Sequence, residues 1–145
     1  MQGKSSRTPM ADTKGYVYFA IKTDNDTFDL NWFNSRLNIE PTTFRKKFEK
    51  GQTPKCTIWK YSTPNLTNPV YFEEIENLID RLVPFKEEFK ILKQENPDFH
   101  YVLEVVIFLG DQTPGLNFSQ KALDFIQYVG GEIDCDIYNS YLANE

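Results

Sequence analysis

Three acidic residues near the C-terminus, Glu132, Asp134 and Asp136, form the group in this sequence whose types and spacing could do chemistry. They alternate with two isoleucines and Cys135, and two-residue alternation places the two sets on opposite faces of a strand. Carboxylates gathered on one face repel one another. This acidic stripe must therefore face water, a cation or a basic partner.

The stripe by itself is a poor metal site. Side chains two residues apart on a strand are separated by about 7 Å, which is too far for three of them to coordinate one Mg²⁺ at about 2.1 Å. Two of them could share a metal only with a ligand from another strand, for which Glu104 and Asp111 are the candidates. We predict no metal and no cofactor. The alternatives are a surface for a cationic partner and a solvated face or edge strand protected by its charge.

Charge is unevenly distributed along the chain. From residue 98 to residue 145 there are eight carboxylates and one cation, Lys121. The stretch 45–60 holds six cations and one carboxylate, Glu49. The net charge of −5 argues against nucleic acid as the main partner, because phosphates need clustered Lys and Arg. The basic stretch could pair with the acidic stripe within the molecule, stay solvated, or form a nucleic-acid surface with its aromatic neighbours.

Groups for covalent or acid–base catalysis are sparse. His100 is the only histidine, so His-rich zinc sites are excluded, and its place at the start of an apolar strand favours a structural role over a general base or a cysteine partner. Cys56 and Cys135 are too few for a disulfide scaffold. We expect Cys135 to be a buried reduced thiol, although a bridge to Cys56 could form if their strands are neighbours. No phosphate-loop, serine-hydrolase or zinc-protease motif occurs, and we predict no catalytic residues.

Periodicity and capping signals predict the elements that would position these groups. Strands are expected over 16–23, 55–61, 99–109 and 132–138. Helices are expected from an N-cap at Asp29 to about 38, from 71 to about 95 with an interruption at Pro84, and from a cap at Asn117 or Ser119 to Gly130. Leu30 is expected on the buried stripe of the first helix. The order β-α-β-α(α)-β-α-β predicts an α/β (α+β) layered sandwich: one mixed sheet of about four to five strands with helices packed on it.

Length and composition predict a single globular domain over residues 15–145 that follows a flexible leader over residues 1–14. No run of 18 apolar residues occurs, and the N-terminus has no apolar signal core. We therefore expect a cytoplasmic protein.

Several segments in a fixed order resemble the bacterial family known as domain of unknown function 4279. They are Leu37-Asn-Ile-Glu-Pro-Thr42, Lys50-Gly51, Trp59, the helix Leu116–Ile126, Gly130 and Ile133-Asp-Cys-Asp-Ile-Tyr138. The likeness covers roughly residues 16–138 and departs from the family pattern at Asn38, where the family usually has glycine. The resemblance implies a small cytosolic α/β domain without an established activity, and it brings no catalytic residues.

The sequence favours a non-enzymatic module that binds a basic protein, such as an immunity-type inhibitor of a basic toxin or nuclease. Carboxylates would steer the encounter and mimic phosphate, and tyrosines would hold the complex. The predicted binding residues are Glu132, Asp134, Asp136, Asp111, Tyr138 and Tyr141. Two alternatives stay open: a metal-assisted enzyme using Glu104, Asp111, Asp134, Asp136 and His100, and a housekeeping domain that is a monomer or a homodimer paired through a strand edge.

Overall fold

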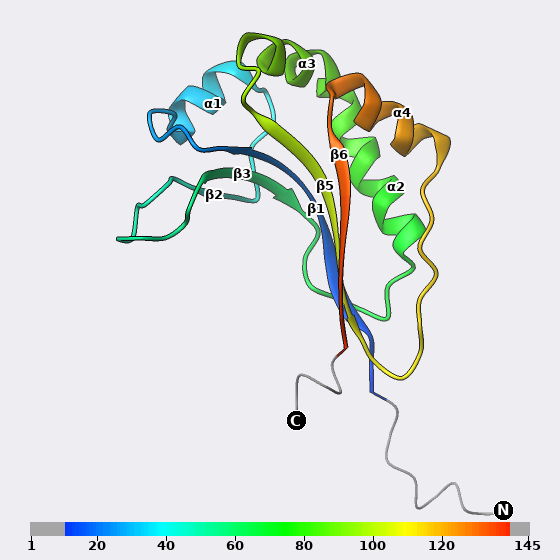
Figure 1. Cartoon of the computed structure of the whole chain (residues 1–145). Helices are drawn as coiled ribbons and strands as arrows, with labels where there is room; N and C mark the ends of the chain where they lie inside the picture. Colours follow the sequence, from blue (N-terminus) through cyan, green and yellow to red (C-terminus); the bar gives the residue numbers. More distant parts are fainter. Residues whose placement is uncertain (1–10, 140–145) are drawn as a thin grey trace, which may run out of the picture.

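The computed structural model describes residues 11–139, and Figure 1 shows a curved sheet with helices along one side of it. The strands are β1 (Lys14–Thr23), β2 (Thr43–Arg45), β3 (Thr57–Ser62), β4 (Leu66–Thr67), β5 (His100–Leu109) and β6 (Glu132–Asn139). The helices are α1 (Leu30–Arg36), α2 (Tyr71–Leu82), α3 (Lys86–Glu95) and α4 (Gln120–Val129), and a 3₁₀ turn, η2 (Val83–Phe85), joins α2 to α3. The predicted mixed α+β sandwich is confirmed.

The strand order of the sheet is β2-β3-β1-β5-β6, and the short β4 pairs with the start of β1. Strand β1 is antiparallel to both β3 and β5, whereas β5 and β6 are parallel. Parallel neighbours need a crossover connection, which α4 supplies. Strand β6 is an edge strand because it is the last in this order, and the basic stretch 45–60 lies at the opposite edge, at β2 and β3.

Helices α2, α3 and α4 cover one face of the sheet and bury a core rich in aromatic residues. Phe19 lies at its centre, where its ring contacts Phe89 (5.2 Å between ring centroids), Phe125 (5.6 Å) and Tyr101 (5.7 Å) edge to face. This geometry aligns the positive edge of one ring with the negative face of another. The core thus fixes β1 and β5 against the helices.

Two buried tyrosines connect the sheet to the helices by hydrogen bonds. The hydroxyl of Tyr71 in α2 donates to the carbonyl of Val106 (3.1 Å), and the hydroxyl of Tyr101 in β5 donates to the carbonyl of Phe89 (2.6 Å). Buried hydroxyls need such partners because an unpaired one costs free energy. The bonds hold α2 and α3 at fixed positions over β5.

Local signals set several element ends as predicted. The Asp29 carboxylate accepts the backbone N–H of Trp32 at the start of α1, and the Ser119 hydroxyl accepts that of Ala122 at the start of α4. Gly130 ends α4 in the left-handed conformation (φ 78°). Pro84 lies in the 3₁₀ turn between α2 and α3, where its missing N–H breaks the helix.

Other expectations are corrected or fall outside the described residues. Leu30 is 38% exposed: of the residues in the short α1 only Phe33 is buried, and the other buried residue of the predicted stripe, Leu37, is the C-cap. Strands β2 and β4 were not expected, since three and two residues carry too little alternation to recognise. Of the predicted leader, residues 1–10 are not described, and Lys14 is the first residue of β1. Every helix within residues 11–139 is too short or too polar to cross a bilayer.

Candidate functional site

The face of the sheet opposite α2, α3 and α4, here called the open face, carries the candidate site. No helix of the described residues lies on it. Alternation along β1, β5 and β6 places the following residues there: Tyr16, Tyr18, Ala20, Lys22, Val102, Glu104, Val106, Phe108, Glu132, Asp134, Asp136 and Tyr138. Small and apolar members of this set form their own buried cluster, separate from the helix-covered core. The open face therefore has an apolar floor with polar groups around it.

Three carboxyl groups meet on this face. Glu104 lies opposite Asp134 in the parallel pairing of β5 and β6, and the next pair on the same face is Val106 with Asp136. One carboxylate oxygen of each acidic residue lies within 4.8 Å of the others. Strand pairing thus adds Glu104 as the third member of a group that the acidic stripe could not complete alone. We call Glu104, Asp134 and Asp136 the carboxyl cluster.

Glu104 is the unusual member of the cluster. Glu104 is 5% exposed, and its Oε2 atom has no hydrogen-bond partner among the described residues. Burial raises the pKa of Glu104 to about 8, and the neighbouring Asp136 and Asp134 carboxylates contribute to this rise. Near neutral pH Glu104 therefore holds its proton unless a cation approaches.

The other half of the open face is basic. Lys60 of β3 places its Nζ atom 4.2 Å from the centre of the Tyr18 ring, and burial and the charge of Lys22 lower the pKa of Lys60. Burial and the Glu104 charge raise the pKa of the Tyr18 hydroxyl, so this hydroxyl stays protonated. Within residues 11–139, no lysine or arginine forms an ion pair with the carboxyl cluster.

The basic stretch does not neutralise the acidic stripe, contrary to one of the alternatives considered above. Strands β1 and β5 separate β3 from β6, and the ion pair of the basic stretch is internal, between Arg45 and Glu49. The open face is therefore polarised from a basic edge at β2 and β3 to an acidic edge at β6.

An exposed aromatic pair adjoins the carboxyl cluster. Phe108 and Tyr138 face each other in the β5–β6 register, one step along from Val106 and Asp136. Their rings are stacked, 5.2 Å apart with an interplanar angle of 18°, and they are 37% and 48% exposed. Exposed stacked rings beside charges are typical of interface anchors.

The structure brings together only part of the predicted binding set. Asp134, Asp136 and Tyr138 lie side by side on the open face. Glu132 lies at the start of β6, where its Oε2 atom is 3.6 Å from the Nε2 atom of His100. Asp111 is outside the carboxyl cluster and accepts the backbone N–H of Ala11 (2.5 Å), and Tyr141 lies outside the described residues.

Phe108 and Lys22 were not singled out from the sequence. Alternation places both residues on the open face of their strands. Only the strand order shows that Phe108 of β5 lies beside the acidic strand β6 and that Lys22 of β1 lies beside the basic strand β3. Without the strand order, the mostly apolar sequences of β1 and β5 indicate only that these strands belong to the core.

His100 and Cys56 line one hollow of about 160 Å³ at an end of the sheet, together with Lys22, Asp24 and Asp98. Burial raises the pKa of the Cys56 thiol, which disfavours the thiolate that a cysteine nucleophile needs. Cys56 and Cys135 are both free thiols, and two strands lie between the segments that carry them. The conditional Cys56–Cys135 bridge therefore does not form.

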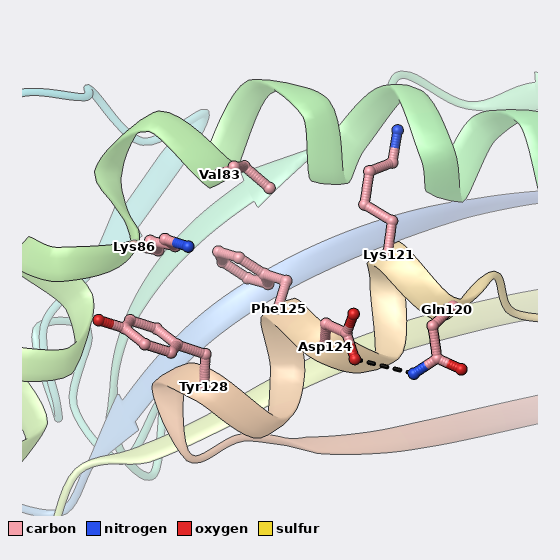
Figure 2. Close-up of a pocket in the computed structure, with 7 residues that line it drawn as sticks. All are labelled: Val83, Lys86, Gln120, Lys121, Asp124, Phe125 and Tyr128. Carbon is pink, nitrogen blue, oxygen red and sulfur yellow. Dashed lines mark hydrogen bonds between the residues drawn. The ribbon is translucent and has the colours of Figure 1, made fainter.

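A larger hollow, of about 360 Å³, lies over α4 next to the α2–α3 junction (Figure 2). Its polar groups already have partners in the fold: Asp124 accepts from Gln120 (2.8 Å), and Lys121 pairs with Glu76 (3.0 Å) and Asp80 (2.5 Å). The Nζ atom of Lys86 lies 4.8 Å from the centre of the Tyr128 ring. This hollow offers a ligand fewer uncommitted polar groups than the open face does.

The sequence model of the family described as Domain of unknown function (DUF4279) matches residues 13–140. No curated protein and no solved structure matches the chain.

Proposed function

The chain belongs to the DUF4279 family, whose description names no activity, and we propose that it is a non-enzymatic module that binds a basic protein through the acidic half of its open face. A toxin or nuclease with a cationic active-site surface fits this chemistry, because carboxylates can occupy positions that phosphates would take.

One observation carries the proposal: carboxyl groups that form no ion pair with a described lysine or arginine lie beside an exposed aromatic pair, on a sheet face that no helix within residues 11–139 covers. The carboxylates of Asp134 and Asp136 would accept lysine or arginine side chains of the partner. Phe108 and Tyr138 would bury their exposed area at the centre of the contact, where aromatic residues contribute most of the binding free energy.

The charge distribution supports a directional encounter. The acidic edge at β6 and the basic edge at β2 and β3 give the open face a charge gradient, which orients a partner before contact. Such steering raises association rates by about 10- to 1,000-fold and weakens as salt increases. The same gradient would repel an acidic partner from β6.

The test compares two triple variants of equal net charge. In one, Glu132, Asp134 and Asp136 become lysine. In the matched control, the exposed residues Glu40, Glu73 and Glu95, which lie away from the open face, become lysine. Proteins captured from the source cells by the unmodified chain are identified, purified and measured by surface plasmon resonance at several salt concentrations.

The proposal expects a basic partner whose association rate falls at least 10-fold with the stripe variant and whose salt dependence flattens. The control variant should bind as the unmodified chain does. A purified partner that binds both variants equally, or a partner that is acidic, would refute the proposal.

A metal-assisted enzyme, the other function class raised by the sequence, first requires that the carboxyl cluster bind a metal ion.

A further inference from the structure

We propose that Glu104, Asp134 and Asp136 together bind one divalent cation of the oxygen-preferring class, such as Ca²⁺, Mn²⁺ or Mg²⁺. This site goes beyond the proposed binding of a basic protein and does not depend on it. It would also change the electrostatics of the same face, because a bound divalent cation places two positive charges beside β6.

The geometry of the carboxyl cluster suits a single ion. Oxygen atoms that share a cation at about 2.1–2.5 Å are themselves about 3–5 Å apart, and the three carboxylate oxygens lie within 4.8 Å of one another. Two neighbouring hydrogen-bonded strands hold the donors, with Glu104 opposite Asp134 and Asp136 one step further along the face. The donors are thus positioned by the backbone and not by flexible loops.

The unpartnered oxygen of Glu104 is an independent sign of a missing ligand. Glu104 is more than nine-tenths buried, and its Oε2 atom accepts no hydrogen bond from any described residue. A buried polar atom without a partner costs free energy, and such atoms are rare in native proteins. A cation between the three carboxyl groups would satisfy this oxygen and offset the repulsion among them.

The neighbouring cations of the protein do not take this role. Lys22 and Lys60 share the open face with Glu104, and both influence its environment. The Lys60 ammonium, however, is directed over the Tyr18 ring, and neither lysine forms an ion pair with the cluster among the residues described. The Asp134 and Asp136 carboxylates are therefore available to an external cation.

The donor set fixes the class of cation. All three donors are carboxylate oxygens, which favour Ca²⁺, Mg²⁺ and Mn²⁺ over metals that prefer sulfur or nitrogen. Cys135 belongs to the opposite face of β6, where it packs against the helix-covered core, and His100 lies beside Glu132. Because Asp134 is exposed and Asp136 partly so, water would complete the coordination, and we expect a dissociation constant of about 10⁻⁵ to 10⁻³ M.

The test is isothermal titration calorimetry of the full chain, freed of metal by chelation, with CaCl₂, MnCl₂ and MgCl₂ and without any protein partner. The variants are Glu104→Gln and Asp136→Asn, and the matched control is Glu40→Gln, an exposed carboxylate away from the cluster. Circular dichroism checks that each variant folds. As a second measurement that needs no variant, Mn²⁺ is added to the isotope-labelled chain and its paramagnetic broadening of NMR signals is mapped.

We expect one saturable site for at least one of these ions, weakened at least 10-fold by either cluster substitution and unchanged in the control. Broadening by Mn²⁺ should centre on residues 104, 134 and 136. The absence of saturable heat at 10 mM metal, broadening centred elsewhere, or equal affinity in the Glu104→Gln variant would overturn the site. Because no partner is present, this result is independent of whether a basic protein binds the open face.

Discussion

Glu104 of β5 lies opposite Asp134 of β6 in the parallel pairing that ends the sheet. This pairing turns an alternating acidic strand into a cluster of three carboxyl groups. It also buries one of them, so that Glu104 holds its proton far more tightly than an exposed glutamate would. The chemistry of the open face follows from this single alignment of two strands.

Glu104 should make the stability of the protein fall as pH rises. Its pKa is about 8 in the folded chain, against an ordinary value of 4.5, so the folded state binds the proton more tightly than the unfolded state. The resulting stabilisation is complete below about pH 4.5 and is lost as pH rises through 8. Because one pKa unit is worth about 1.4 kcal/mol, the full shift corresponds to about 5 kcal/mol. Solvent screening at this edge of the sheet reduces the effect, and we expect a loss of about 2 to 4 kcal/mol over this range.

Urea unfolding in metal-free buffer between pH 5 and pH 9 measures this loss. The Glu104→Gln variant, which stays neutral, should lack that part of the pH dependence and should be the more stable protein above pH 8. The Glu40→Gln control should follow the unmodified chain. Parallel curves for Glu104→Gln and the unmodified chain would contradict the assignment.

Gly15 should tolerate no side chain. A β-carbon at this position would collide with the Val106 carbonyl and the Tyr71 hydroxyl, which are the two partners of the hydrogen bond between α2 and β5. We expect Gly15→Ala to lower the free energy of unfolding by about 2 to 3 kcal/mol. Gly115→Ala, where a β-carbon would meet no atom within 4 Å, should change it little, and equal effects in chemical denaturation would argue against this packing.

Asp29 should stabilise α1 as its N-cap, a role that another N-capping residue can take over. Its carboxylate accepts the Trp32 N–H at 2.9 Å, and loss of such a cap costs about 1 kcal/mol. Thermal unfolding should therefore show a lower melting temperature for Asp29→Ala and near-complete recovery for Asp29→Ser, whose hydroxyl can accept the same bond. If serine fails to restore the stability that alanine removes, Asp29 does not act through its cap.

Tyr138 and the acidic stripe should affect partner binding through different rate constants. Tyr138→Ala removes contact area from the stacked pair with Phe108, so it should raise the dissociation rate at least 10-fold and leave the salt dependence unchanged. Charge reversal on the stripe should instead slow association. Phe48→Ala, which removes an aromatic ring that is 50% exposed in the basic segment, is the matched control; an equal loss from that change would exclude an anchor role for Tyr138.

The sequence predicts single elements better than it predicts their neighbours. The strand over residues 132–138, the Asp29 cap and the left-handed Gly130 are local properties, and each is confirmed. The alternation of the strand breaks down at its end, where Ile137, expected on the apolar face, is 56% exposed. Short strands such as β2 gave no periodic signal, because three residues cannot establish a period. The exposure of Leu30 was not predicted. Leu30 is the first residue of the short α1, and which side chains of such a helix are buried depends on tertiary packing.

The candidate site required information that spans the sheet. The stripe residues were identified from spacing alone, and Glu104 was one of two residues considered as a partner from another strand. The choice between Glu104 and Asp111 depends on the register of β5 against β6, which no local pattern encodes. The same register brings Phe108 beside Tyr138.

The most direct test of the carboxyl cluster is a pH titration of its side-chain carboxyl carbons by ¹³C NMR in metal-free buffer. We predict that Glu104 titrates near pH 8 in the unmodified chain and at a lower pH in Asp136→Asn, because that change removes a neighbouring negative charge. If Glu104 titrates near 4.5 and does not respond to Asp136→Asn, the three carboxyl groups do not share a site.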